Sequence, residues 1–245
     1  MTCNPKWPEI QRCLGPKEVA SDRPDISARV FKLKVDSLIH DLTVKQFWGV
    51  VLAYSYTIEW QKRGKLLTDT TILLPFTNTV FLTGLPHVHL LLFMANEDKP
   101  HTTEHVNRVV TAEMPNQHTH PELASLVEQH MVHGPCGEDG PNAPCMVGTG
   151  ADRKCSKRYP KEFQEATVQL EEQYPRYRRR SPAQGGRVIL TRGRRRVTNE
   201  WVVPYNPVLL HRYRCHMNVE SVHCLEAVKY IFKYITKGKC LKSCC

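Results

Sequence analysis

The sequence contains no run of about 18 apolar residues, the length that a membrane-spanning helix needs. Its opening, MTCNPKWPEI, lacks the apolar region of a secretory signal peptide. It also has no Gly-x-x-x-x-Gly-Lys-Ser/Thr phosphate loop, so ATP-driven unwinding would need a part that is absent from these residues. We therefore expect neither a membrane partner nor helicase activity in this stretch of protein.

Acidic residues are fewer than basic ones, and the formal net charge is +10. Nine of the 21 residues from Arg176 to Arg196 are arginine. Such a cluster indicates either a polyanionic partner or a solvated loop, and the sequence leaves both readings open. Ten cysteines without a secretory signal indicate reduced thiols or metal ligands rather than a disulfide framework.

Hydrophobic patterning predicts both helices and strands. The expected elements are a helix in 30–49 ending near Gly49, strands over 50–61 and 88–94, helices around Pro115 and Pro121, loops over 133–160, a strand over 211–220 and a helix over 220–238.

Two histidines stand one residue apart in GLPHVHLLLF, residues 84–93. Side chains at positions i and i+2 of a strand point to the same face, so His87 and His89 project side by side while Val88 faces the core. Two neutral imidazoles aimed at one point form half of a metal site. The alternative is a pair of surface histidines on an edge strand.

A third ligand is expected from the preceding strand. Glu59 and Gln61 share one face of it, and Glu59 is preferred because a carboxylate is the harder ligand for Mg²⁺. Glu220 is a second candidate, and a surface glutamate without a metal is the alternative for Glu59.

The predicted helix over 220–238 carries two tyrosines four residues apart, Tyr230 and Tyr234, which therefore lie on one face. Lys233 and Lys237 flank them, and lysines favour the phenolate form. A tyrosine hydroxyl beside a bound metal could attack a phosphodiester and form a covalent phosphotyrosine. Ordinary amphipathic packing of the tyrosines is the alternative.

A second metal site is indicated in the loops over 133–160. Four ligand-type side chains fall within 23 residues: His133, Cys136, Cys145 and Cys155. Three cysteines and one histidine suit a structural Zn²⁺. The stretch lacks paired Cys-x-x-Cys knuckles, and scattered free cysteines are the alternative; Cys215, His216 and Cys224 are expected in the core or in strands.

Four stretches together resemble the Rep/HUH endonuclease region of Helitron rolling-circle transposases, the Helitron helicase-like N-terminal domain. They are TCNPKWPEI (2–10), GLPHVH (84–89), VVPYNPVLLHRYRCHMNVE (202–220) and AVKYIFKYITKG (227–238). The resemblance implies an α+β fold: a ferredoxin-like antiparallel sheet with flanking helices, the histidine strand central, and here a loop-rich Cys/His insertion. It predicts a single HUH endonuclease-like domain over 1–245.

The same resemblance implies an activity. Family members nick and transfer single-stranded DNA through a 5′-phosphotyrosine intermediate, with Mg²⁺ or Mn²⁺ as cofactor. They carry a helicase domain downstream, which would be a partner missing from this chain, and as eukaryotic transposases they would act in the nucleus. A catalytically inactive remnant that still binds single-stranded DNA is the alternative function.

One departure from the family pattern concerns residues 65–84. Family members run from Gln-Lys-Arg-Gly directly into Leu-Pro-His, whereas here Gly64 and Leu85 are 20 residues apart. We therefore expect an insertion at 65–84, with a natural hairpin extension as the alternative. Both ends of the chain are expected to be truncated.

Further residues are expected to contact DNA. Thr2 and Asn4 belong to the opening motif, although Asn4 before proline also suits a simple turn. Trp7 and Trp60 could stack on bases, but core positions are expected. The basic candidates are Arg63, Arg178, Arg179, Arg180, Arg194, Arg195 and Arg196.

Overall fold

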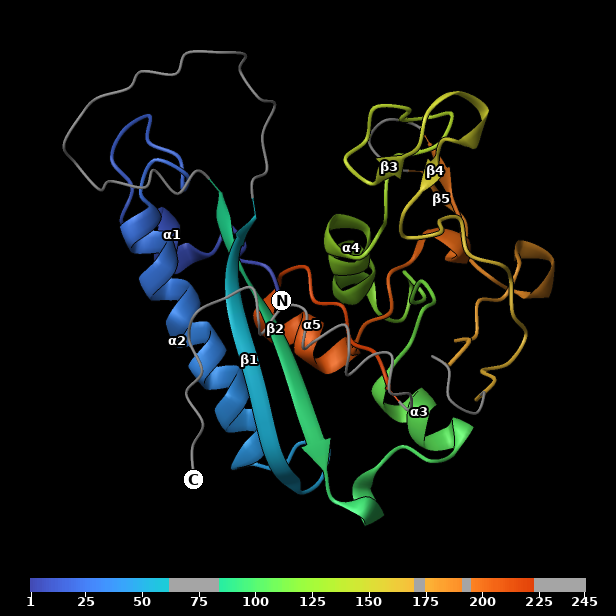
Figure 1. Cartoon of the computed structure of the whole chain (residues 1–245), viewed down its shortest axis with the longest axis horizontal. Helices are drawn as coiled ribbons and strands as arrows, with labels where there is room; N and C mark the ends of the chain where they lie inside the picture. Colours follow the sequence, from blue (N-terminus) through green and yellow to red (C-terminus); the bar gives the residue numbers. More distant parts are fainter. Residues whose placement is uncertain (62–83, 170–174, 191–194, 223–245) are drawn as a thin grey trace. The chain divides into compact units, whose positions relative to one another are not determined.

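The computed structural model describes residues 1–61, 84–169, 175–190 and 195–222, and its elements are labelled in Figure 1. The chain divides into two compact units. Unit 1 comprises the described residues of Met1–Asp98, and unit 2 those of Lys99–Lys229. Each unit is described by itself.

Unit 1 begins with two helices, α1 (Pro8–Gln11) and α2 (Pro24–Thr43). Proline near the start of each suits the first helical turn, where its missing N–H has no partner to lose. The buried apolar residues of α2 recur every three or four positions and so lie on one face: Phe31, Val35, Leu38 and Leu42. The ring of Trp7 stacks on Phe31, with centroids 6.5 Å apart.

Two long strands follow, β1 (Val51–Gln61) and β2 (Leu85–Met94), and they pair antiparallel. The start of β1 depends on Gly49, whose φ is +105° and where a Cβ would lie 2.3 Å from Cγ of Asp98. That carboxylate accepts the N–H of Val50 at 2.7 Å. A side chain at position 49 would therefore displace the carboxylate that anchors the strand.

The N-terminal segment runs along the other edge of β2. The N–H of Cys3 donates to the carbonyl of Pro86, and the N–H of Val88 donates to that of Met1, each at 2.9 Å. β2 thus lies between β1 and this segment.

The two faces of the hairpin differ. Ile58 and Val88 are directly opposite each other on one face, and Val88 is buried. Tyr54 and Tyr56 share that face, and both interact electrostatically with Lys32 of α2. Helix α2, which contacts β2 and runs along the hairpin in Figure 1, therefore packs on the Val88 face. His87 and His89 lie on the opposite face.

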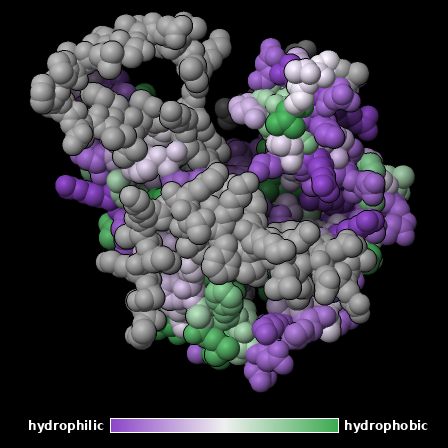
Figure 2. Space-filling model, viewed as in Figure 1, coloured by the Kyte–Doolittle hydropathy of each residue, from purple (hydrophilic) through white to green (hydrophobic). Residues whose placement is uncertain are grey.

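A hydrophobic patch lies on unit 1 where β1 begins and β2 ends (Figure 2). Four exposed apolar residues make it up: Phe47, Val50, Leu52 and Phe93.

Unit 2 contains short helices and two-residue strands joined by long loops. Its helices are α3 (Thr103–Val109), α4 (Pro121–His130) and α5 (Pro207–Tyr213). Its strands are β3 (Met146–Val147) with β4 (Lys154–Cys155), and β5 (Ile189–Leu190) with β6 (Arg196–Val197), each pair antiparallel.

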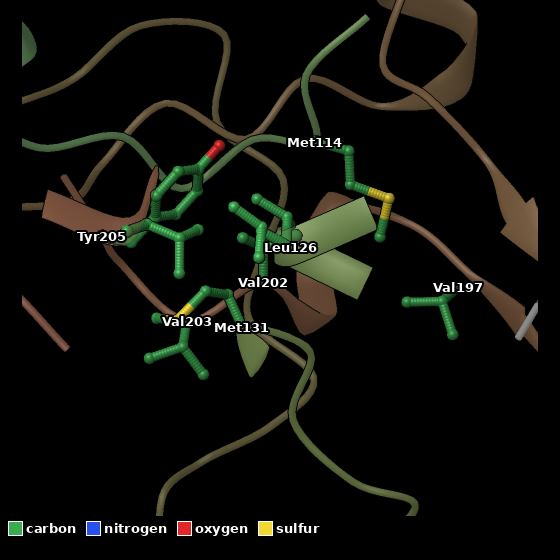
Figure 3. Packing of buried hydrophobic residues seen from close by; sticks show 9 residues of the cluster. Met114, Leu126, Met131, Val197, Val202, Val203 and Tyr205 are labelled. Carbon is green, nitrogen blue, oxygen red and sulfur yellow. The ribbon is translucent and has the colours of Figure 1, made fainter. Parts of the chain in front are cut away.

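The larger core of unit 2 gathers residues from α4, α5 and the segments around them (Figure 3). It consists of Met114, Leu126, Val127, Met131, Val197, Val202, Val203, Tyr205 and Leu210. The phenol of Tyr205 donates to the carbonyl of Glu113 at 2.9 Å, which satisfies the one polar group that this ring brings into the core.

These observations agree with an α+β class built on antiparallel pairs. The ferredoxin-like arrangement and the single domain over 1–245 stay predictions. Within the described ranges, no helix has both the length and the apolarity to cross a membrane.

The predicted strands over 50–61 and 88–94 are present, the second beginning three residues earlier at Leu85. Helix α2 ends at Thr43 rather than near Gly49, because Gln46 adopts a left-handed φ of +50°. The prediction of a strand over 211–220 is wrong, because its first residues belong to α5. The side chain of Asn206 caps this helix by accepting the N–H of Leu209. The helix over 220–238 lies outside the described residues from 223 onward.

Candidate functional site

Three of the predicted ligands come together on the face of the β1–β2 hairpin opposite Val88. The ligand atoms of Glu59, His87 and His89 all lie within 4.8 Å of one another. Glu59 Oε1 is 3.1 Å from His89 Nε2, and the two imidazole rings meet edge to face with centroids 4.6 Å apart. The register explains the grouping, since Glu59 stands opposite His87 and diagonal to His89.

The donor set fits a hard or borderline divalent cation. One carboxylate oxygen and two imidazole nitrogens suit Mn²⁺, and a carboxylate with retained waters suits Mg²⁺. The side chains of His89 and Glu59 are 25% and 39% exposed, so water or phosphate oxygens could reach the ion and complete its coordination. The three residues could therefore hold either ion.

Thr2 supports one of these histidines. Its hydroxyl lies 2.6 Å from Nδ1 of His87, and the backbone bridge between the two residues holds them in register. A hydrogen bond at Nδ1 leaves Nε2 to face a metal. Thr2 is only 2% exposed, so the predicted DNA contact does not fit its placement.

A second group lies in unit 2. The ligand atoms of His133, Cys136, Cys145 and Cys155 also lie within 4.8 Å of one another, and these residues could hold a metal such as zinc. Sγ of Cys155 is 3.4 Å from Nε2 of His133.

Burial sets the protonation states of Cys136 and His133. Burial, followed by hydrogen bonds with Cys145 and Cys155, raises the pKa of Cys136 to about 12. Burial and then the nearby charge of Arg195 lower the pKa of His133, so its ring is neutral and able to ligate. Without a cation the Cys136 thiol keeps its proton, which metal binding would displace.

One family matches the chain. Residues 1–66 match the Helitron helicase-like domain at N-terminus. This segment is Helitron-related. A comparison with curated proteins finds no match to the chain.

The Helitron-like segment contains Glu59, Thr2 and Asn4, while His87 and His89 follow it. The match ends at residue 66, close to residue 65, where the insertion over 65–84 is expected to begin. Oδ1 of Asn4 accepts the N–H of Lys6 at 2.9 Å, which is the geometry of the simple turn considered above.

Several predicted residues of the Helitron reading lie outside the described residues. They are Arg63, Arg194, Cys224, Tyr230, Lys233, Tyr234 and Lys237. Gln61 pairs with Leu85 through its backbone. Glu220 belongs to unit 2, and its carboxylate accepts from Nδ2 of Asn218 at 3.2 Å.

The described arginines of the cluster differ in exposure. Arg179 is 4% exposed and donates to the carbonyls of Asn199 and Val202 at 2.7 and 2.6 Å. That placement gives it a role inside unit 2 and does not fit a DNA contact. Arg178 and Arg180 stay partly exposed.

Arg195 and Arg196 also differ in exposure. Arg195 is mostly buried, pairs with Asp139 at 2.9 Å and lies 3.8 Å from the ring centroid of Trp201. Arg196 is exposed on β6. Trp7 and Cys215 are buried as expected, and Trp60 and His216 are half-buried.

Sequence reasoning missed Glu113, which anchors two of these arginines. Its buried carboxylate accepts from Arg178 Nε at 3.1 Å and from the guanidinium of Arg180 at 2.8 and 2.9 Å. Burial alone would raise the pKa of Glu113, but the bonds and charges of the two arginines lower it overall. Only the abundance of nearby arginines hinted at such a partner.

Proposed function

We propose that this chain is the metal-dependent nicking and strand-transfer part of a Helitron-type transposase, acting on single-stranded DNA. The observation that carries the proposal is the convergence of Glu59, His87 and His89 on the hairpin face opposite Val88. Glu59 belongs to the Helitron-related segment, and the two histidines follow that segment in the sequence. An HUH endonuclease requires such a histidine pair, and fold alone would not argue this function.

Glu59, His87 and His89 would hold the metal. A bound Mg²⁺ or Mn²⁺ would supply Lewis-acid polarisation of the phosphodiester. Thr2 would keep the ring of His87 in the required orientation. Because α2 covers the opposite face, the scissile phosphate would approach from the histidine side.

The nucleophile would be Tyr230 or Tyr234. The phenol loses its proton and its oxygen attacks phosphorus; the bond from phosphorus to the 3′-oxygen breaks, and that oxygen leaves as a 3′-hydroxyl after taking a proton. The product is a 5′-phosphotyrosine. Because the new ester conserves the bond energy, a second 3′-hydroxyl can reverse the step and transfer the strand. Lys233 and Lys237 would favour the phenolate.

Basic side chains would hold the strand, with the exposed arginines of unit 2 as candidates. A helicase domain elsewhere in the transposase would supply unwinding, and the similarity to eukaryotic transposases supports a location in the nucleus. These parts of the proposal rest on the Helitron-related segment.

A labelled single-stranded oligonucleotide incubated with the full chain and Mn²⁺ tests the activity. We expect a covalent protein–DNA adduct that resists denaturation. The double variant with Tyr230→Phe and Tyr234→Phe should abolish it, and His87→Ala should lower its rate at least 100-fold. His105→Ala, at an exposed position on α3, is the matched control and should leave the adduct unchanged.

The same assay separates the two candidate functions. Binding of the oligonucleotide without any adduct, over a range of sequences and Mn²⁺ concentrations, would refute the nuclease and support the inactive remnant. An adduct that survives the double tyrosine variant would refute the proposed nucleophiles.

A further inference from the structure

We propose that His133, Cys136, Cys145 and Cys155 form a structural zinc site that holds the loops 133–160 of unit 2 together, independently of the proposed nuclease metal. The regular structure of these loops is limited to the two-residue strands β3 and β4 and one short 3₁₀ turn. Something besides backbone pairing is needed to hold them.

An apolar core does not do it. Among the described side chains of 133–160, Cys136 and Cys155 alone are buried, and most of the others are exposed. Neither cysteine belongs to the hydrophobic clusters of unit 2. Short segments without a core of their own are commonly held by a disulfide or a metal. All three cysteines of this group are free thiols here.

The backbone brings the ligands together at specific points. Pairing of β3 with β4 puts Met146 opposite Cys155, so that the preceding residue, Cys145, lies close by; its carbonyl accepts the N–H of Ser156 at 2.7 Å. Cys136 sits in a tight turn that closes at Gly140, where a Cβ would lie 2.5 Å from the carbonyl oxygen of Pro135. The β3–β4 pair and the turn after Cys136 therefore bring the three cysteines to one point.

The spacing and chemistry fit zinc. Tetrahedral coordination with a Zn–S length of about 2.3 Å and a Zn–N length of about 2.1 Å separates sulfur from nitrogen by about 3.6 Å. The observed separation between Sγ of Cys155 and Nε2 of His133 is 3.4 Å. Thiolates are soft ligands that disfavour Mg²⁺ and Mn²⁺, and four protein ligands leave no open position for a reaction.

The aromatic neighbours fix the histidine ligand. The ring of Tyr159 stacks on His133 with centroids 4.1 Å apart and planes 15° from parallel, and it also stacks on Trp201 with centroids 6.4 Å apart. The N–H of His133 also donates to the carbonyl of Trp201 at 2.8 Å. Both aromatic residues pack against the larger core of unit 2. Tyr159 is therefore a positioning residue that joins the zinc site to that core.

Metal analysis of the full chain, purified without chelators, tests the site. We expect one zinc per chain. After exchange of zinc for Co²⁺, we expect the absorption bands of tetrahedral cobalt with thiolate charge transfer. Cys145→Ser should lower the zinc affinity at least tenfold, and Cys13→Ser, at an exposed free cysteine outside the group, should not change it. Tyr159→Ala should weaken zinc binding and Tyr159→Phe should preserve it.

Other results would overturn the proposal. A wild-type chain that folds and binds no zinc, a cobalt spectrum without thiolate bands, bound iron in place of zinc, or unchanged zinc affinity in Cys145→Ser would each do so. The cobalt spectrum of the wild type decides the ligands even if a cysteine variant fails to fold. His87→Ala should keep its zinc, so a failure of the nuclease proposal leaves this measurement intact.

Discussion

The contact between Thr2 and His87 joins residues 85 positions apart in the sequence. Replacing Thr2 by valine keeps the shape of the side chain and removes the hydroxyl. Because partners of metal-ligating histidines typically contribute 10- to 100-fold to metal affinity, we expect Thr2→Val to weaken Mn²⁺ binding by about that factor. Thr2→Ser should restore most of it. Calorimetric titration with Mn²⁺ measures both, and equal affinities in the two variants would contradict the positioning role.

Glu113 stabilises unit 2 through two arginines, and its contribution depends on pH. Its folded pKa lies below the usual value of 4.5, so the stabilisation is complete above about pH 4.5 and disappears as the pH falls through the lower folded value. At pH 7, Glu113→Gln should lower the free energy of unfolding by about 1–3 kcal/mol, because the hydrogen bonds that the two arginines donate to a buried, charged carboxylate are weakened or lost.

Chemical denaturation across pH measures this effect. The variant should also lose part of the stability change that the wild type shows below pH 4.5. Glu104→Gln, at an exposed position of α3, is the control and should change stability by less than about 0.5 kcal/mol. Identical pH profiles for Glu113→Gln and the wild type would show that the carboxylate does not act this way.

Arg179 presents a different test of charge. Arg179→Met leaves the carbonyls of Asn199 and Val202 without that donor, and we expect a loss of about 1–3 kcal/mol in the free energy of unfolding. Affinity for single-stranded DNA, measured on the folded fraction, should stay the same. Arg196→Met should instead lower the affinity for single-stranded DNA and leave the free energy of unfolding unchanged. A stability-neutral Arg179→Met would be inconsistent with its buried contacts.

At the level of elements, the register of the hairpin bears on the expected insertion. Gln61 pairs with Leu85. Removing residues 65–84 would leave only Lys62, Arg63 and Gly64 between these two partners. Three-residue hairpin loops commonly end with a left-handed residue, which glycine adopts without strain. The pairing is therefore compatible with a chain from which the 20 residues are absent.

We expect the deletion of 65–84 to fold and to retain Mn²⁺ binding. A shorter connection lowers the entropy cost of closing the hairpin, by about 2 kcal/mol on loop-closure scaling. Amide hydrogen exchange at Glu59 and His87, which pair across the hairpin, reports on the hairpin directly, and thermal unfolding reports on stability. Loss of amide protection in the deletion variant would show that the segment is needed for the fold.

The strands and the three-ligand group were predictable from the sequence because both depend on local periodicity. Alternation in 50–61 and the spacing of His87 and His89 fix which side chains share a face. Helix α5 was missed because the apparent alternation in 211–220 outweighed Asn206 and Pro207, a capping residue followed by a first-turn proline. The burial of Arg179 and the Thr2 contact depend on distant backbone that local patterns do not reveal.

At the scale of the whole molecule, the net charge of +10 favours a polyanionic partner, so the proposed binding of DNA should depend on salt. The logarithm of the affinity for single strands should fall linearly with the logarithm of the salt concentration, by about 0.7 for each phosphate neutralised. Fluorescence anisotropy with labelled oligonucleotides measures the slope. Binding that is insensitive to salt would contradict a partner recognised through its phosphates.

The two candidate metal groups lie in different units and differ in hardness. A carboxylate and two imidazoles in unit 1 favour Mn²⁺ or Mg²⁺, whereas three thiols and an imidazole in unit 2 favour zinc. A chelator chosen for hard or for soft metal ions should therefore remove the metal from one group and leave it in the other.

Helix α2 occupies one side of the β1–β2 hairpin, and this makes the proposed chemistry directional. An inhibitor would have to compete with the scissile phosphate for the face that carries the histidines, and a small phosphate mimic could do so. A ligand bound over α2, however tightly, would leave the cleavage step untouched unless it bent the hairpin itself.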